Sequence, residues 1–171
     1  MLKFFTEDID FKQPQPIKTS KWIKSISLSE GYEINSLNYI FCSDAYLLEI
    51  NKQYLDHDYF TDIITFDQSE IEDVIEGDIY VSIDRVKENA ENLGQDFNVE
   101  LRRVLIHGLL HLVGYDDTSD ELKKEMRFLS CTLLKISTWN IYFYFVLLLN
   151  IKNEYVSRIR CDRSRRRTRR L

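Results

Sequence analysis

Cysteine is scarce in this sequence and has no obvious pairing. Its three copies are Cys42, Cys131 and Cys161, and they form no C-x-x-C pair. An odd count without such a pair excludes a disulfide framework and a cysteine-based zinc knuckle. Two prolines and five glycines exclude collagen-like repeats and long flexible linkers. The first residues, MLKFFTEDIDFKQ, are acidic where a secretory signal needs an apolar core, so we expect a cytoplasmic protein.

The 171 residues are enough for one ordinary globular domain with its own core, since 44% are hydrophobic and 30% are charged. The net charge of −5 hides a division along the chain. Residues 1–151 carry 14 basic and 26 acidic side chains, a balance of −12, whereas residues 152–171 carry 9 basic and 2 acidic ones, a balance of +7. Such asymmetry marks either a nucleic-acid-binding tail or a tail that is foreign to the domain.

The C-terminal part changes character abruptly at residues 133–151, LLKISTWNIYFYFVLLLNI. Its uninterrupted apolar run, residues 141–149, has nine residues, whereas a spanning helix needs about 20. Three interpretations stay open: a membrane anchor followed by arginines, a packed helix followed by a disordered basic end, or a non-native extension such as the product of a shifted reading frame. We predict a domain over residues 1–130 and an atypical apolar, then arginine-rich, tail over residues 131–171, and we do not expect a membrane partner.

Hydrophobic periodicity and turn residues predict alternating strands and helices. We expect strands at 2–11, 33–42, 61–66 and 76–83, and helices near 16–30, 44–55, 82–94 and 98–114, with another beginning at 118. The order β-α-β-α-β-β-α-α-α favours an α+β fold, in which helices pack on a small mixed sheet of about four strands.

The segment HGLLHLVGYDD, residues 107–117, predicts a metal site. His107 and His111 lie four apart, so a helix places both imidazoles on one face, where they can reach one ion. Gly114 lets the helix end in a left-handed turn that brings Asp117 back to the same ion. The spacing H-x-x-x-H-x-x-G-x-x-D matches the zincin-like geometry of the metzincin site, in which a third histidine stands at the last position.

Gly108 stands where zinc peptidases of this type carry the glutamate that acts as general base. Its absence weighs against a protease. A glycine in a helix costs roughly 1 kcal/mol relative to alanine, so we expect Gly108 to have a reason, such as leaving room beside the metal.

Together with YLLEINKQYLDHDYFTDIITFD and EGDIYVSIDRVKENA, this segment resembles the YbeY-type rRNA maturation factors, over residues 2 to about 127. The resemblance implies a metal-dependent endoribonuclease that cleaves single-stranded RNA, processes the 3′ end of 16S rRNA and acts in ribosome quality control. It implies zinc bound by His107, His111 and position 117, with the small ribosomal subunit or a ribosomal protein as partner and RNA rather than DNA as substrate.

The chain departs from the family pattern at three places. Asp117 replaces a histidine, and as a harder ligand it makes Mn²⁺ or Mg²⁺ acceptable beside Zn²⁺. Leu55 stands where the family commonly has an arginine thought to help catalysis. The tail has no counterpart in the family.

Further residues have open roles. His57 is an alternative third ligand or phosphate donor, or an exposed loop residue. Asp116 is a candidate catalytic residue that could orient a histidine N–H, or it caps the turn. Asp62 and Thr65 flank a buried strand near the expected substrate cleft, where structural capping is the plainer interpretation. Two other functions stay open: a non-catalytic ribosome assembly factor with a structural metal site, and, less favoured, a zinc peptidase.

Overall fold

A four-stranded mixed sheet organises the fold, and the computed structural model describes it within residues 1–56 and 58–136. The strands lie in the order β1-β2-β4-β3. β1 pairs in parallel with β2, β2 pairs in parallel with β4, and β3 runs antiparallel to β4. In chain order, the elements are β1 (Leu2–Thr6), α1 (Pro16–Ser29), β2 (Glu33–Cys42), α2 (Asp44–Leu55), β3 (Ile63–Asp67), β4 (Val74–Ser82), α3 (Ile83–Leu93), α4 (Phe97–Leu112) and α5 (Asp120–Ile136).

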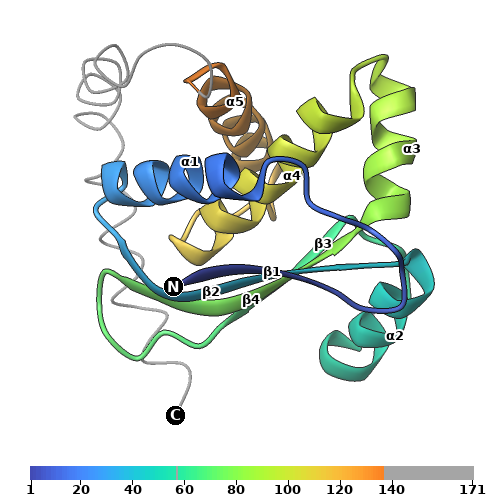
Figure 1. The fold of residues 1–171 in the computed structure, drawn as a ribbon, viewed down its shortest axis with the longest axis horizontal. Coiled ribbons are helices and arrows are strands. Elements are labelled where there is room, and N and C mark those ends of the chain that lie inside the picture. Colours follow the sequence, from blue (N-terminus) through green and yellow to red (C-terminus); the bar gives the residue numbers. More distant parts are fainter. Residues whose placement is uncertain (57, 137–171) are drawn as a thin grey trace. The chain divides into compact units, whose positions relative to one another are not determined.

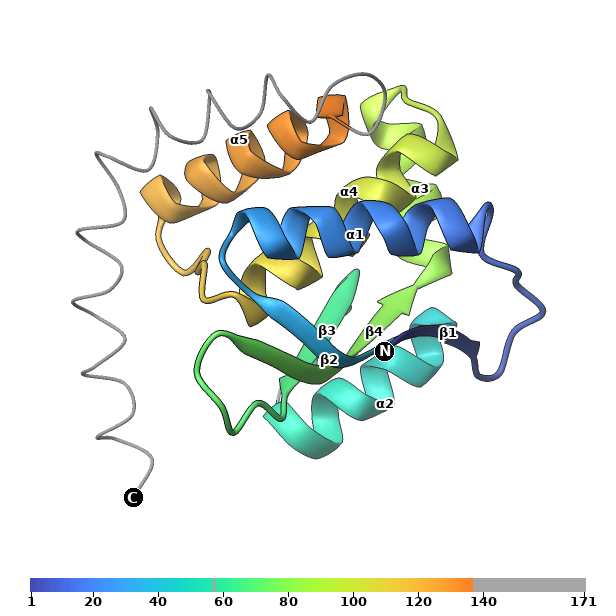
Figure 2. The same cartoon turned by 60° about the vertical axis from the view of Figure 1, so that its left-hand side comes forward.

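The helices lie on both faces of the sheet. α1 and α4 pack on one face, α5 lies over the same side, and α2 covers the other face (Figure 1, Figure 2). The strands alternate accordingly: Ile64 faces α2 with Cys42 and Leu47, whereas Ile63 and Ile79 face α4. The α+β class and the order of elements predicted from the sequence are confirmed.

The element boundaries differ from the predictions in a few places. β1 ends at Thr6 rather than near residue 11. α4 begins at Phe97, one residue before the expected start at 98, because Asp96 caps it by accepting from the backbone N–H of Asn98.

Residues 1–134 form one compact unit. The boundary predicted between residues 130 and 131 lies within α5, while residues 137–171, which contain most of the predicted tail, lie outside the described residues. The division into domain and tail therefore stays a prediction. Among residues 1–56 and 58–136, no helix combines the length and the apolar character that crossing a membrane requires.

Candidate metal site and adjoining groove

α4 positions the two histidines because its opposite side is anchored in the core. Leu105 and Leu109, which lie opposite the two histidines on the helix, are fully buried. A hydrogen bond also ties the helix to β2, since the Tyr39 hydroxyl donates to the Leu105 carbonyl at 2.9 Å. Burial of these apolar residues fixes the rotation of the helix and turns the histidine face toward the rim of the sheet.

Gly114 ends the helix and reverses the chain, as the spacing predicted. Its φ is +97°, a conformation that residues with a Cβ rarely adopt. The Gly114 N–H donates to the His111 carbonyl at 3.0 Å, and the Tyr115 N–H donates to the Leu110 carbonyl at 2.9 Å. This closing pattern returns the following residues toward the helix face that carries the histidines.

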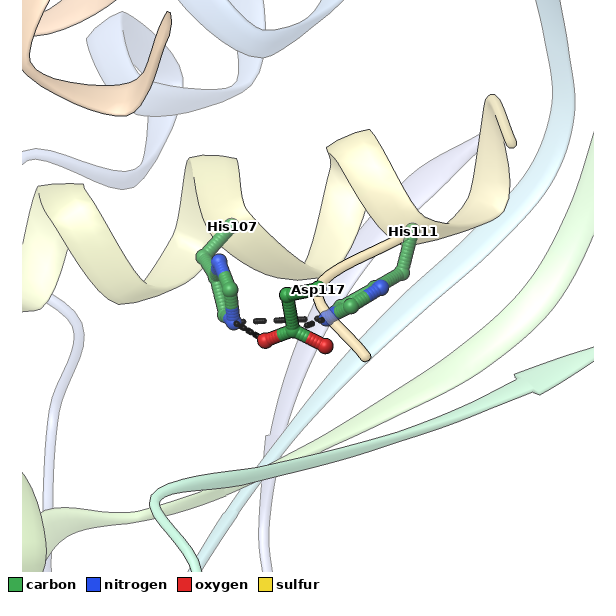
Figure 3. Close-up of side chains that lie close together, drawn as sticks. All are labelled: His107, His111 and Asp117. Carbon is green, nitrogen blue, oxygen red and sulfur yellow. Dashed lines mark hydrogen bonds and ion pairs between the residues drawn. The ribbon is translucent and has the colours of Figure 1, made fainter. Parts of the chain in front are cut away.

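The reversal brings three ligand-type side chains together (Figure 3). His107 Nε2 lies 3.3 Å from His111 Nε2 and 3.6 Å from Asp117 Oδ2. His111 Nε2 lies 3.9 Å from the same oxygen. One ligand atom from each residue lies within 4.8 Å of the others, a spacing that suits one ion held at roughly 2 Å from each.

The position of the proton on His111 follows from a backbone contact. His111 Nδ1 lies 3.2 Å from the carbonyl oxygen of Tyr115, which can only accept. The N–H of the neutral ring is therefore on Nδ1, and the lone pair of Nε2 points into the cluster. The sequence left open whether the Asp116 side chain orients a histidine N–H, and in the structure the contact to His111 Nδ1 comes from the Tyr115 main-chain carbonyl.

His107 is kept neutral by its surroundings. Burial, followed by the proximity of His111, lowers its pKa from 6.5 to about 4, although the carboxylates of Asp62 and Asp117 oppose the shift. A neutral imidazole is the form that binds a metal, so this ring is ready to act as a ligand at neutral pH.

The other predicted site residues are placed differently. Asp116 Oδ1 accepts from the backbone N–H groups of Asp117 and Thr118, at 2.7 and 3.2 Å, which is the turn-capping alternative. Its place among the catalytic candidates stays a prediction. His57 and the side chain of Leu55 lie outside the described part of the chain, so the alternatives for His57 stay open.

Gly108 does not make room beside the candidate metal ligands, contrary to the sequence-based expectation. A Cβ at this position would lie 2.5 Å from Ile63 Cδ1 and 2.9 Å from Ile79 Cγ2, because this side of α4 rests on β3 and β4. The glycine therefore serves close packing between helix and sheet. A glutamate here would start against the sheet and not beside the cluster.

A charged network next to the cluster was not found by sequence reasoning. Arg103 Nε and Nη2 donate to the two carboxylate oxygens of Glu100 at 2.8 and 2.6 Å, and Nη2 also donates to Asp62 at 3.2 Å. Glu100 is fully buried. The signal was available, since Arg103, His107 and His111 follow one another at intervals of four and form a polar stripe on α4.

A groove adjoins the cluster at the rim of the sheet. Its volume is about 350 Å³, near the lower end of the roughly 300–1,000 Å³ typical of small-ligand sites. It is lined by Asn51, Tyr59, Thr61, Ile63, Ile64, Thr65 and His111. Because His111 belongs to both features, a molecule in the groove lies directly beside the candidate metal ligands.

Known proteins resemble this chain over most of its length. The family model described as Endoribonuclease YbeY matches residues 6–137. The Endoribonuclease YbeY of Cytophaga hutchinsonii is 53% identical over 124 residues, which are 72% of this chain and 87% of that protein. The Flavobacterium psychrophilum protein of the same name is 50% identical over 123 residues, with the same shares of each chain.

The fold is also found in a solution structure of the Thermotoga maritima protein TM1509. The two share 29% of their sequence with a TM-score of 0.54, over 80% of this chain and 89% of the other. The residues that the family model matches include β2, β3, β4, α4 and the candidate metal ligands. The chain belongs to the Endoribonuclease YbeY family.

Proposed function

We propose that this protein is a zinc-dependent endoribonuclease that cleaves single-stranded RNA and acts in rRNA maturation, at the 3′ end of 16S rRNA, and in ribosome quality control. The observation that carries the proposal is the convergence of His107, His111 and Asp117, with ligand atoms within 4.8 Å of one another. Membership of the Endoribonuclease YbeY family supports the choice of RNA as substrate.

The three residues would hold the ion through His107 Nε2, His111 Nε2 and a carboxylate oxygen of Asp117. Three protein ligands leave a coordination position open for water or substrate, as in catalytic zinc sites. When bound, the metal supplies polarisation of a phosphoryl oxygen and a water of lowered pKa. The Tyr115 carbonyl holds the His111 ring in the tautomer that presents Nε2 to the ion.

The ligand set differs from three histidines in charge and hardness. The Asp117 carboxylate neutralises one charge of the ion and is a harder ligand than imidazole. We therefore propose zinc as the resident metal, with Mn²⁺ or Mg²⁺ as accepted substitutes.

The charge of the domain favours a protein or ribosomal partner. Residues 1–151 carry a balance of −12, whereas affinity for RNA comes largely from neutralised phosphates. We propose that the small ribosomal subunit, or a ribosomal protein on it, supplies the missing affinity in the cytoplasm.

The packing of α4 disfavours the peptidase alternative. Position 108, where a peptidase carries its glutamate base, is directed at Ile63 and Ile79 of the sheet. A non-catalytic assembly factor would keep the metal cluster but cleave no RNA, and the test below separates it from the nuclease.

The test compares cleavage of a single-stranded RNA that spans the 3′ end of 16S rRNA, a matched duplex and casein, with and without chelator. We expect chelator-sensitive cleavage of the single strand alone, abolished in His111→Ala. Bound zinc is measured in His111→Ala, Asp117→Ala and His57→Ala, and we expect the first two to lose it and the third to keep it. Zinc binding without RNA cleavage would establish the assembly-factor alternative, and zinc loss in His57→Ala alone would overturn the ligand set.

A further inference from the structure

β3 leaves one side of its backbone facing the groove. In the sheet order β1-β2-β4-β3 it is an edge strand, paired with β4 alone among the described residues. The Ser82 N–H donates to the Asp62 carbonyl at 3.0 Å, which makes these two residues a hydrogen-bonded pair. Such pairs alternate along an antiparallel ladder, so the N–H and C=O groups of Ile63 and Thr65 point away from β4.

The lining of the groove agrees with this assignment. Ile63, Ile64 and Thr65 are consecutive residues, and their side chains point alternately to the two faces of the sheet. A single groove can be lined by all three only if it follows the edge of the strand. The Thr61 hydroxyl donates to the Ile63 carbonyl at 3.3 Å. Of these two residues, Thr65 is therefore the one whose N–H and C=O are both available to a ligand, as far as the contacts of the described residues go.

Tyr59 adds an aromatic surface to the same groove. Tyr59 lines the groove and is 57% exposed, so part of this aromatic residue is accessible to a ligand. Asn51, which is buried, donates to the Tyr59 carbonyl at 2.8 Å. At the next residue, the guanidinium of Arg85 lies over the Phe60 ring, 4.7 Å from its centre. The chain is thus held at the Tyr59 carbonyl and at Phe60.

We propose that this edge groove binds one unpaired nucleobase of the RNA, which stacks on Tyr59 and is hydrogen-bonded by the N–H and C=O of Thr65. The inference rests on the proposed function, because it places the base next to a phosphodiester at the metal cluster through the shared His111. Splayed bases of single strands are recognised by aromatic stacking together with hydrogen bonds to their edges. A base-paired nucleotide presents neither its face nor its pairing edge, so the groove selects single strands.

The test measures coupling between the base and the ring. Short single-stranded RNAs, each with one abasic nucleotide at a different position, are bound to the protein in the presence of chelator and cleaved in the presence of zinc. For the wild type, we expect removal of the base at one position beside the cleaved bond to weaken binding roughly 5- to 100-fold. Tyr59→Ala weakens binding of the intact RNA by a similar factor and shows no further loss with that abasic RNA, whereas Tyr59→Phe keeps the wild-type pattern.

Phe5→Ala is the matched control. Phe5 is a 46% exposed aromatic residue on β1, at the opposite edge of the sheet, and its loss leaves binding unchanged. Thermal unfolding confirms that the variants are folded. Independent, multiplying losses from Tyr59→Ala and the abasic site overturn the inference, as does binding of an extended peptide in the groove in place of RNA. A wild type that cleaves none of the RNAs refutes the proposed function instead.

Discussion

The two sides of α4 differ in chemistry and in role: one packs on the sheet, and the other carries the polar side chains of the candidate metal site. The side on the sheet is apolar and fits by shape, to the point that Gly108 leaves no space for a methyl group against Ile63 and Ile79. The other side carries the polar stripe of Arg103, His107 and His111, whose partners are carboxylates and each other. A helix can keep charged and metal-binding groups half-buried at the rim because its opposite side is tightly anchored.

Breaking the polar stripe at Arg103 is expected to have the largest effect on stability. Arg103→Met leaves the fully buried Glu100 without its cation, and we expect the free energy of unfolding to fall by roughly 3–5 kcal/mol. Denaturant unfolding measures the loss. The double variant Glu100→Met with Arg103→Met removes both charges and recovers most of it; a double variant as unstable as the single one would contradict this explanation.

The neutral state of His107 predicts a pH dependence of stability. Its pKa is about 4 in the folded chain and 6.5 as a free side chain, so the unfolded chain binds more protons between these values. Stability is therefore fully present above pH 6.5 and falls as the pH drops toward 4, by roughly 3 kcal/mol for this group.

Chemical unfolding of the metal-free protein from pH 4 to 7 tests this dependence. His107→Gln cannot titrate, so its stability should fall less over the same range, and the difference between the two curves isolates the histidine. Parallel curves would show that His107 does not account for the loss.

On the apolar side, Gly108→Ala tests how tight the fit is. Alanine gains about 1 kcal/mol of helix propensity, but overpacking costs roughly 1–3 kcal/mol, so we expect a net loss of about 1 kcal/mol. Thermal and denaturant unfolding are the measurements. In an Ile63→Val background, which lacks the nearest methyl group, the same substitution should cost less or stabilise; stabilisation in the wild-type background would refute the close contact.

Asp117→His, beside the polar side of α4, is expected to change stability least and to alter the metal preference of the candidate site. The Asp117 side chain is 38% exposed, so we expect a change within about 0.5 kcal/mol. Three imidazoles are softer than two imidazoles and a carboxylate, so the variant should favour zinc over manganese more strongly than the wild type. Competition between the two metals, measured by bound-metal analysis, gives the ratio; an unchanged ratio would count against Asp117 as a ligand.

Local patterns predicted much of this molecule. Hydrophobic periodicity and caps yielded the order of elements, and the spacing of two histidines and Gly114 predicted which side chains converge with Asp117. These features succeed because they depend on geometry within one helix and its terminal turn. The Arg103 stripe has the same spacing and was available to the same reasoning, but the contact of Arg103 with Asp62 could not be found from spacing, because Asp62 is 41 residues away in the sequence.

The sequence by itself determined the fold class, the ligand cluster and the membership of the family, since each is encoded in short-range spacing or in similarity along the chain. Only the tertiary structure decided that Gly108 serves the contact with the sheet and that a backbone carbonyl orients His111. It also decided that β3, within the described part of the chain, is an edge strand whose outer side lies beside the candidate metal ligands. These facts depend on which distant segments meet, and packing of the whole chain decides that.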